Sequence, residues 1–509
     1  MKTNQLKFGV YLSYVSIFVT NITNLILTPF IVRNLGQSEY GLYMLIGAMI
    51  GYIAVLDFGL GNTTIRYIAK YRAEEDREGQ ENFLAITSII YMIISFIIII
   101  VGVLMFLNLD TIFSNSLTTH EIEIAEVMFG ILIINLALTL PMKSFTGIIT
   151  AYEKFILPRA ITIARILVRA MVILILLSLG YKAIAIVLVD AILNILIMIF
   201  TLVYVFLTLK VKIRLHTFSK SLFKEILSYS SLVFVSVVVD QIYWRIGHLV
   251  LGVFSSTKVV GIFAIGMTMG QYFIAFSTAI SGVFLPKITK MVVNKASGEQ
   301  LTDLLIKTGR LQFLVLGLVV SGFVLFGDKF IFLWVGAGYE SSWIIALIVM
   351  IPLTIVLTQT IGISILQAKN MHGFRAITYL CISVINMFIS IYLAHIYGAI
   401  GVAFGTTLSL ILGNIIAMNV YYHYKVGLNI PRFFKELFNG LLIAFILSLS
   451  LGLIILMISD NSWMALIIQC VIYLIIYVSV MWRLGMNNYE KELLVNEFIQ
   501  AKRKLPQQG

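Results

Sequence analysis

The chain has 509 residues, of which 60% are hydrophobic and only 12% are charged, and its mean hydropathy is +1.00. Soluble globular proteins are about one-quarter charged, so this composition excludes an ordinary soluble enzyme and indicates an integral membrane protein. The net charge of +12 is spread over short segments between apolar stretches. This distribution argues against a nucleic-acid-binding domain and is typical of charges that orient a protein in a membrane.

Fourteen apolar stretches follow one another, each near the length of about twenty residues that a helix needs to cross about 30 Å of hydrocarbon. Their predicted ranges are 10–32, 40–66, 83–107, 124–149, 158–179, 183–208, 227–252, 259–284, 308–333, 343–367, 374–396, 400–424, 436–458 and 463–484. Lipid offers no hydrogen-bond partner to the backbone, so each stretch must be helical. The sequence therefore predicts an all-α polytopic membrane protein with about 14 transmembrane helices.

Positive charge is distributed unequally between the two sides of these spans. Of the 36 Lys and Arg residues, four fall in the loops of one side and four lie within spans. The rest lie in the alternate loops, at the termini or at the adjoining helix ends, which is the pattern of cytoplasmic segments. Both termini are therefore predicted to be cytoplasmic, in a cell membrane. The longest outer loop, near residues 108–123, is too short for a catalytic domain, and the tail after Trp482 is expected to be a short surface helix with solvated charges.

The chain also contains an internal repeat. The tetrapeptide RAIT at residues 159–162 recurs at 375–378, and YKAI at 181–184 aligns without a gap with YGAI at 397–400. Six spans separate the copies, so both have the same orientation, as in the parallel repeats of many transporters. The predicted organisation is an N-lobe at 1–208 (spans 1–6), a C-lobe at 209–425 (spans 7–12), two further spans at 426–484 and a cytoplasmic tail at 485–509.

Cationic side chains within the spans are the first candidates for function, because an ionisable group at mid-bilayer costs several kcal/mol. Arg165 and Arg169 are four residues apart and share one helix face. A rise of 1.5 Å per residue places Arg169 about 15 Å below the cytoplasmic mouth of its span, near the midplane. Arg245 lies within the seventh span. Lys143 is close enough to a helix end for its amino group to reach the interface.

Three carboxylates, Asp57, Asp190 and Asp240, also lie within spans. One interpretation pairs them with Arg169 and Arg245 as structural ion pairs. The other is a water-filled cavity with net positive walls, to which Arg66 at a helix end would add. Such a cavity suits an anionic substrate, because guanidinium binds phosphate and pyrophosphate in a bidentate manner without losing its proton.

Catalytic signatures are missing from the sequence. It contains no G-x-x-x-x-G-K-[ST] motif, no Ser/His/Asp constellation and no metal-ligand spacing, and Cys381 and Cys470 lie far apart within apolar spans. The sequence therefore predicts a transporter rather than an enzyme, with no catalytic residue, no metal and no cofactor.

The N-terminal region carries motifs of a known family. The run RNLGQSEYGLY at 33–43, followed by LDFGL at 56–60 and RYIAKY at 66–71, resembles the polysaccharide-biosynthesis (Wzx-type) flippases. These belong to the multidrug/oligosaccharidyl-lipid/polysaccharide (MOP) exporter superfamily, which includes the MATE transporters. The motifs cover about the first seventy residues, whereas the number and order of spans agree over nearly the whole chain.

The resemblance implies a two-lobed bundle of fourteen helices that flips an undecaprenyl-pyrophosphate-linked oligosaccharide to the outer leaflet by alternating access. The product would be O-antigen, capsule or exopolysaccharide, and a polysaccharide polymerase or glycosyltransferase would be a partner. In relatives, cations line the central cavity. That role maps here onto Arg165, Arg169, Arg245, Lys143 and Arg66. The superfamily also suggests a coupling proton or sodium ion, for which Asp57 and Asp240 are the carboxylates to examine.

Three other functions stay open. A MATE-like drug/cation antiporter would share the fold, but it should have a carboxylate-rich cavity and typically twelve spans. A lipid II-type peptidoglycan precursor flippase has the same number of spans, but that group carries several arginines in its first two spans, and here the first span has none before Arg33. A membrane polymerase or ligase would need a larger outer loop.

Overall fold

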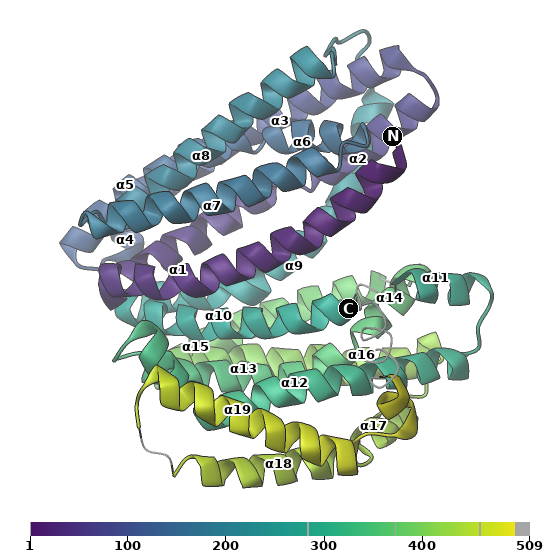
Figure 1. Cartoon of the computed structure of the whole chain (residues 1–509). Coiled ribbons are helices and arrows are strands. Elements are labelled where there is room, and N and C mark those ends of the chain that lie inside the picture. Colours follow the sequence, from purple (N-terminus) through teal and green to yellow (C-terminus); the bar gives the residue numbers. More distant parts are fainter. Residues whose placement is uncertain (1, 282–284, 372, 458–459, 494–509) are drawn as a thin grey trace, which may run out of the picture. The chain divides into compact units, whose positions relative to one another are not determined.

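The computed structural model describes residues 2–281, 285–371, 373–457 and 460–493, which are helical with short connections and contain no β-strand (Figure 1). Contacts divide the chain into two compact units. Unit 1 comprises Met1–Ala264 and Met387–Val402, and unit 2 comprises Ile265–Asn386 and Ala403–Gly509. The lobe boundaries drawn from the sequence repeat stay a prediction.

The helices of the first half of the chain largely cover the predicted spans, but the first helix continues from the first span into the second, and two helices share the fourth span. They are α1 (Lys2–Ile53), α2 (Leu60–Ala73), α3 (Arg77–Leu107), α4 (Leu109–Phe113), α5 (Thr119–Thr139), α6 (Met142–Ala151), α7 (Ile156–Ser178), α8 (Ala183–Val203) and α9 (Lys220–Phe254). A short 3₁₀ segment, η1 (Ala54–Asp57), lies between α1 and α2, and a π-helical turn, η2 (Tyr204–Thr208), extends α8.

The second half continues in the same way. Its helices are α10 (Thr257–Ser281), α11 (Leu285–Val293), α12 (Gly298–Val335), α13 (Glu340–Thr358), α14 (Thr360–Ala368), α15 (Gly373–Leu410), α16 (Met418–Tyr421), α17 (Ile430–Phe438), α18 (Leu441–Ile455) and α19 (Trp463–Val480). Three π-helical segments, η3 (Ile411–Ala417), η4 (Tyr422–Val426) and η5 (Met481–Gly485), adjoin α15, α16 and α19.

Twelve helical stretches of the described chain are long and apolar enough to cross a membrane. Two of them, at residues 7–73 and 373–426, are 67 and 54 residues long, which is more than two crossings require. Each contains a glycine with positive φ, Gly36 (φ 77°) and Gly398 (φ 56°), at the place where the sequence predicts a turn between two spans. Counting each long stretch as two crossings gives about fourteen, so the predicted multi-pass all-α fold is confirmed.

Side-chain caps mark several of the helix starts. Thr118 and Glu121 form a capping box at the start of α5, and Ser297 and Gln300 form another at the start of α12. The Asp76 side chain accepts a hydrogen bond from the backbone N–H of Gly79 at the start of α3. These caps satisfy N–H groups that have no partner within the helix, so the polar loops of the sequence also fix where the helices begin.

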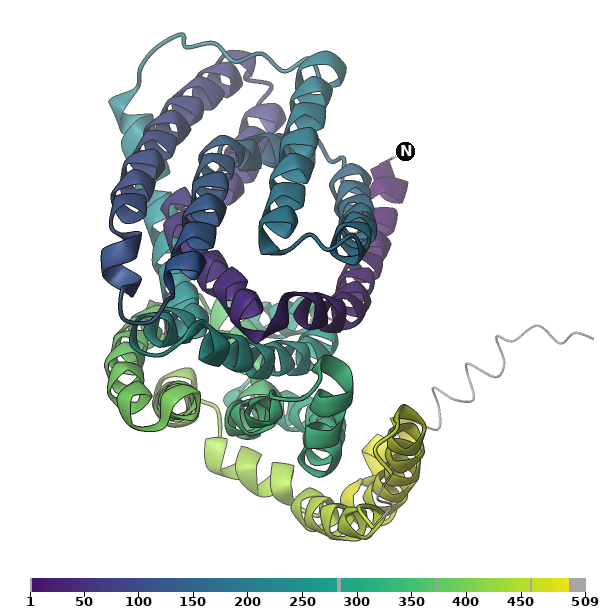
Figure 2. The ribbon, with the colours of Figure 1, turned by 90° about the vertical axis from the view of Figure 1, so that its left-hand side faces the viewer.

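In unit 1, the long helix α1 packs along α7 and α9, while α5 packs against α3 and α8. Figure 2 looks roughly along these helices and shows them nearly end-on. The half-length helix α2 packs against α6. Since α1 contacts both α7 and α9, it connects the helices that carry the predicted arginines.

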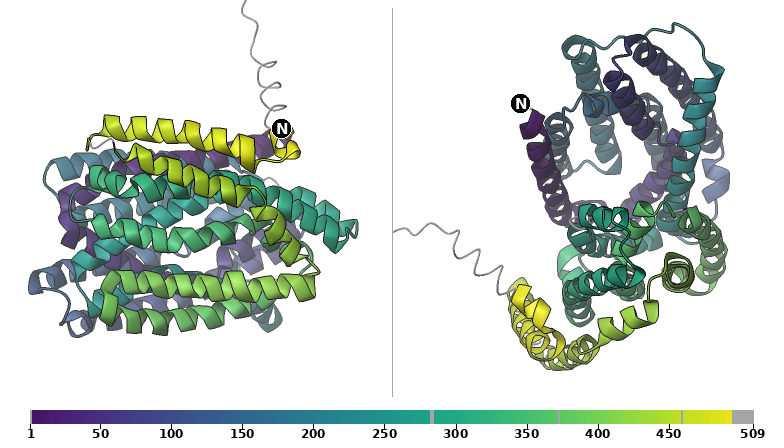
Figure 3. Two further views of the ribbon diagram at one scale, coloured as in Figure 1. Left: turned by 90° about the horizontal axis from the view of Figure 1, so that it is seen from below. Right: turned by 90° about the vertical axis from the view of Figure 1, so that its right-hand side faces the viewer.

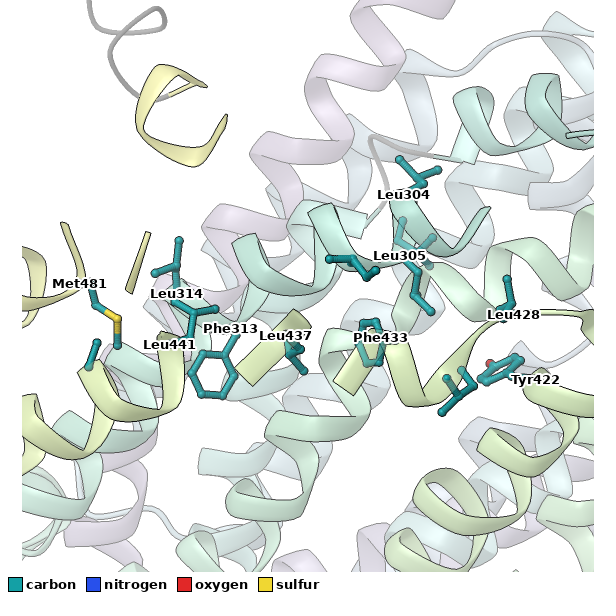
Figure 4. Close-up of a cluster of buried hydrophobic side chains, with 14 of the residues drawn as sticks. Leu304, Leu305, Phe313, Leu314, Tyr422, Leu428, Phe433, Leu437, Leu441 and Met481 are labelled. Carbon is teal, nitrogen blue, oxygen red and sulfur yellow. The ribbon is translucent and has the colours of Figure 1, made fainter. Parts of the chain in front are cut away.

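Unit 2 is built on a buried apolar cluster between α12, α17 and the last two helices (Figure 4). The short helix α17 contributes Phe433 and Leu437, which are fully buried and belong to the same cluster as Phe313 and Leu314 of α12. The helices α18 and α19 pack as an antiparallel pair (Figure 3). The amphipathic α17 is therefore held by its apolar face at the point where α18 begins.

One buried ion pair fixes the ends of these helices. Arg310 of α12 and Glu490 are 5% and 1% exposed, and the Arg310 Nε lies 2.5 Å from a Glu490 carboxylate oxygen. The guanidinium also donates to the carbonyl oxygens of Glu436, Asn439 and Gly485, at 2.6, 2.9 and 2.8 Å. All five donors of the arginine thus have acceptors, most of them carbonyls at helix ends. The sequence suggested that Glu490 belongs to a tail with solvated charges. In the structure Glu490 is buried instead and neutralises this arginine.

Removing one partner of this pair should destabilise the protein severely. Arg310→Met would leave the Glu490 carboxylate buried without its counter-charge, at a cost of about 3–5 kcal/mol. We expect a marked fall in the thermal unfolding temperature of the purified protein in detergent. Arg432→Met is the matched control, because Arg432 pairs with Glu299, Asp303 and Glu436 at the surface, and it should change the temperature little. Equal effects of the two substitutions would contradict the assignment.

Candidate functional site

Arg169 is held in unit 1 by a carboxylate and a phenol. Its Nε and Nη2 donate to the two carboxylate oxygens of Asp190 on α8, at 2.5 and 2.9 Å. Nη2 also donates to the Tyr43 hydroxyl on α1, at 3.4 Å. Of the two interpretations of the buried charges, the ion-pair interpretation therefore holds for Arg169. The bidentate geometry joins α7, α8 and α1 at one point within their apolar spans.

Arg165 lies one turn before Arg169 on α7, next to the same carboxylate. Its Nη2 is 4.0 Å from an Asp190 oxygen, and its Nε is buried without a hydrogen-bond partner among the described residues. The side chains of Arg165, Arg169 and Asp190 are 38%, 21% and 20% exposed. Two guanidinium groups thus share one carboxylate, so these three side chains carry a net charge of +1 and have donors to spare.

Arg245 of α9 reaches the same helix, α1. Its Nη1 donates to the carbonyl oxygen of Gly47 at 3.1 Å. A Cβ at Gly51 would come within 2.8 Å of that nitrogen, so the glycine leaves the space that the guanidinium occupies. Tyr43 and Gly47 are four residues apart on one face of α1, a rise of about 6 Å. Arg169 and Arg245 therefore contact residues one turn apart on α1.

Lys143 and Asp57 form a separate pair. The Lys143 amino group on α6 donates to Asp57 at 2.9 Å, and the Tyr91 hydroxyl on α3 donates to the other carboxylate oxygen at 3.2 Å. The Asp57 side chain is 12% exposed and that of Lys143 is 53% exposed. Asp57 follows Tyr43 by fourteen residues, about 21 Å along a helix. Lys143 is therefore placed apart from the arginine cluster.

Among the described side chains, that of Arg66 does not join the cluster either. Arg66 is exposed on α2, with its guanidinium carbon 6.0 Å from the centre of the Tyr67 ring. Asp240 is part of α9, but its side chain lies outside the described residues. Of the five cations predicted to line a cavity, the structure thus brings together Arg165 and Arg169 beside Asp190, whereas Arg245 contacts the backbone of α1 at Gly47.

Sequence reasoning missed the residues of α1 that receive these arginines. Tyr43, Gly47 and Gly51 follow one another at a spacing of four, which places a hydroxyl and two small residues on one helix face. Small residues at such a spacing mark close helix contacts in membranes. That spacing could have indicated the face of this span that receives long side chains from its neighbours.

The Arg169–Asp190 pair should contribute to stability independently of any ligand. Arg169→Gln leaves the carboxylate without its bidentate donor and should cost more than about 1 kcal/mol, because a buried polar group that loses its hydrogen bonds costs about 1–3 kcal/mol and a charged group costs more. The double variant Arg169→Gln/Asp190→Asn removes this pair but also the carboxylate beside Arg165, so it should recover only part of the thermal unfolding temperature in detergent. A double variant no more stable than the single one would show that the two side chains are not energetically coupled.

Comparison with known proteins places the chain in a family. Residues 6–292 match the family described as polysaccharide biosynthesis protein, and this range contains every predicted site residue. The chain is 23% identical over 500 residues to the uncharacterized membrane protein EpsK of Bacillus subtilis (strain 168), covering 94% of both chains.

Solved structures show the same fold. The lipid II flippase MurJ in an inward closed conformation superposes with a TM-score of 0.72 at 17% identity, covering 96% of this chain and 99% of that one. A multidrug resistance MATE family transporter of the MOP superfamily, in an inward-facing conformation, gives a TM-score of 0.66 at 14% identity, covering 82% and 96%. With more than half of its length matched by the family and the fold of the MOP superfamily, the chain belongs to the polysaccharide biosynthesis protein family, as its N-terminal motifs predicted.

Proposed function

We propose that this protein is a flippase that moves undecaprenyl-pyrophosphate-linked oligosaccharide repeat units from the cytoplasmic to the outer leaflet for surface polysaccharide assembly. Three facts support the proposal: the family match, the fold shared with a lipid II flippase, and the cluster of Arg165, Arg169 and Asp190 within apolar spans. The last is the observation that carries it, because it supplies a charge for a phosphorylated headgroup. Movement would proceed by alternating access, with both termini in the cytoplasm.

The cluster has the donor chemistry that a phosphate needs. Two guanidinium groups offer ten N–H donors, whereas a carboxylate accepts about four hydrogen bonds. Asp190 therefore accepts hydrogen bonds from only some of the N–H donors of Arg165 and Arg169. The net charge of +1 favours binding of an anion. Without substrate, the carboxylate reduces the cost of keeping two cations within lipid. With substrate, phosphate oxygens would take the donors that Asp190 leaves unused, including the buried Nε of Arg165.

Arg245 would bind the second phosphate of a pyrophosphate. It contacts the backbone of Gly47, one turn along α1 from Tyr43, which contacts Arg169. Arginine suits this role because its guanidinium stays charged within an apolar environment and binds phosphate with two parallel hydrogen bonds. The two phosphates would then lie along one face of α1.

The outer surface of α7 suits the isoprenoid tail. Val168, Met171 and Ile175 are 45%, 63% and 54% exposed. At 100° per residue, these three lie about 110° around the helix from the two arginines. An apolar, uncovered stripe thus runs beside the cationic face of the same helix. A lipid-linked substrate could keep its tail in the bilayer along this stripe while its headgroup contacts Arg165 and Arg169.

Deletion of the gene tests the function, and Arg165→Gln tests the site. The deletion strain should lose its surface polysaccharide and accumulate a lipid-linked oligosaccharide, identified by mass spectrometry of extracted lipids. Arg165→Gln keeps the Arg169–Asp190 pair but removes the net positive charge, and a hydrogen bond to a charged group contributes about 1.5–3 kcal/mol. The deletion strain that carries this variant should therefore make at least about tenfold less surface polysaccharide than the same strain with the wild-type protein, at equal protein level.

Arg165→Lys is the matched control, since it keeps the charge and should restore part of the activity. Accumulation of a peptidoglycan precursor in the deletion strain would instead favour a lipid II-type flippase. A strain that accumulates no lipid-linked intermediate would contradict the proposed function. Normal polysaccharide with Arg165→Gln would contradict the role of the cluster.

We further propose that Asp57 couples transport to a proton or sodium gradient, with Asp240 as the second carboxylate to examine. Asp57 accepts hydrogen bonds from Lys143 and Tyr91, so neutralising it would break an ion pair within the membrane. Asp57→Asn should make polysaccharide export independent of the gradient, as measured by export after addition of a protonophore or a sodium ionophore. Lys143→Met, which removes the partner but keeps the carboxylate, should retain gradient dependence. Unchanged gradient dependence of Asp57→Asn would show that the carboxylate is only structural.

A further inference from the structure

Two half-length helices of unit 1, α2 and α6, each begin directly after a break in the chain. Before α2, Phe58 and Gly59 both have positive φ, at 52° and 67°, a conformation that is uncommon for a bulky side chain. Before α6, Pro141 keeps helical dihedrals, but it has no N–H group, so the hydrogen-bond ladder between α5 and α6 is interrupted there. The ion pair between Asp57 and Lys143 connects the two breaks. The second and fourth predicted spans are thus both interrupted, the second by left-handed residues before α2 and the fourth by a proline before α6.

These two half-helices pack tightly on each other. A Cβ at Gly147 would lie 3.0 Å from the carbonyl oxygen of Gly61, and the hydroxyl oxygens of Thr64 and Ser144 are 3.3 Å apart. At the far end, Arg72 of α2 donates to the carbonyl oxygen of Ala151 at the end of α6, at 2.6 Å. Small residues let helix backbones approach closely in membranes, so α2 and α6 form one body connected at both ends.

The other side of α2 contacts α9 through fewer groups. The hydroxyl oxygens of Thr63 and Ser230 are 3.0 Å apart, and the Tyr67 hydroxyl donates to Glu225 at 2.7 Å. At the break, Phe58 stacks on Phe234 with ring centres 4.3 Å apart. We call these three contacts the α2–α9 clasp. Side-chain hydrogen bonds between membrane helices are individually weak, so the clasp is easier to open than the α2–α6 packing.

The second half of the chain repeats the paired half-helices. In unit 2, α11 and α14 pack on each other, and α14 follows a break at Gln359. The first residue of α14, Thr360, follows Met142 by 218 positions, close to the offset of 216 between the two RAIT motifs. The Gln312 side chain contacts the hydroxyls of Ser277 and Thr360 beside this break, at 3.2 and 2.7 Å. Paired half-helices are therefore a feature of both repeats.

We propose that the α2–α6 pair is a gate at the cytoplasmic end of unit 1, which swings as one body about the two breaks when the α2–α9 clasp opens. The proposal rests on the proposed function, because a gate implies a substrate that passes. Hinges of this kind are short segments that absorb a change in backbone dihedrals. Thr63 and Thr64 are adjacent and point about 100° apart, one to α9 and the other to α6, so neighbouring positions can test the two contacts separately.

Two double-cysteine variants test the gate in a background with Cys381→Ser and Cys470→Ser. Thr63→Cys/Ser230→Cys crosslinks the clasp, and Thr64→Cys/Ser144→Cys crosslinks the pair internally. The native oxygens are 3.0 and 3.3 Å apart, compared with about 2.05 Å between the sulfurs of a disulfide. After oxidation of cells of the deletion strain, incorporation of labelled sugar into surface polysaccharide should stop with the clasp crosslink and resume on reduction. It should continue with the internal crosslink, which also controls for the oxidant.

Single cysteines provide a readout that needs no substrate. Ser230 and Ser144 are 0% and 6% exposed, and both are covered by α2. When the clasp opens, α2 stays packed on α6, so position 230 becomes accessible and position 144 stays covered. Opened minor states are commonly populated at about 0.1–10%. In inverted membrane vesicles, a membrane-impermeant maleimide should therefore label Ser230→Cys at least about tenfold faster than Ser144→Cys.

Each result separates the gate from the proposed function. Any of four results would overturn the gate: continued export with the clasp crosslinked, an equal block by both crosslinks, failure of the clasp to crosslink, or equal labelling of the two single cysteines. If the deletion strain accumulates no lipid-linked intermediate, the proposed function is wrong, and the labelling rates still decide the gate.

Discussion

A charged side chain within lipid needs a counter-charge, and the pairing of Arg169 with Asp190 is the interaction on which the candidate site depends. It fixes α7 to α8 and, through Tyr43, to α1. It also keeps Arg165 beside the same carboxylate. Without Asp190, two guanidinium groups one turn apart would repel each other in an environment that solvates neither. The carboxylate therefore makes a cationic cluster tolerable in a membrane without neutralising it.

The same constraint has a different outcome in unit 2. All five donors of Arg310 have acceptors, and its carboxylate partner is almost fully buried. Such a guanidinium has no capacity left for a ligand, and its role is to hold helix ends together. At Arg165, by contrast, a buried Nε has no partner among the described residues. The number of donors left over, rather than burial alone, distinguishes an arginine that can bind substrate from one that stabilises the fold.

The broken helices are subject to an equivalent constraint on the backbone. A break within a span leaves polar groups that lipid cannot satisfy, so it is tolerated only where protein groups supply partners. In unit 1, the Asp57–Lys143 pair lies at the breaks before α2 and α6. In unit 2, the Gln312 amide contacts the carbonyls of Leu357 and Thr358 beside the break at Gln359. One break is thus supported by charges and the other by neutral groups, so only the first can respond to neutralisation of a carboxylate.

Much of the fold could be predicted from the sequence alone. Hydropathy fixes the number and approximate ends of the helices, because the bilayer imposes one length and one hydrogen-bonding solution on every span. The RNLG and DFGL runs indicated the family, and the spacing of Arg165 and Arg169 placed them on one helix face. Only the tertiary structure decided which carboxylate each cation meets. It paired Lys143 with Asp57, left Arg66 exposed, and brought Arg245 to α1 beside Gly51. Those contacts join residues far apart in the chain, and they depend on how the helices pack, which no local pattern of residues encodes.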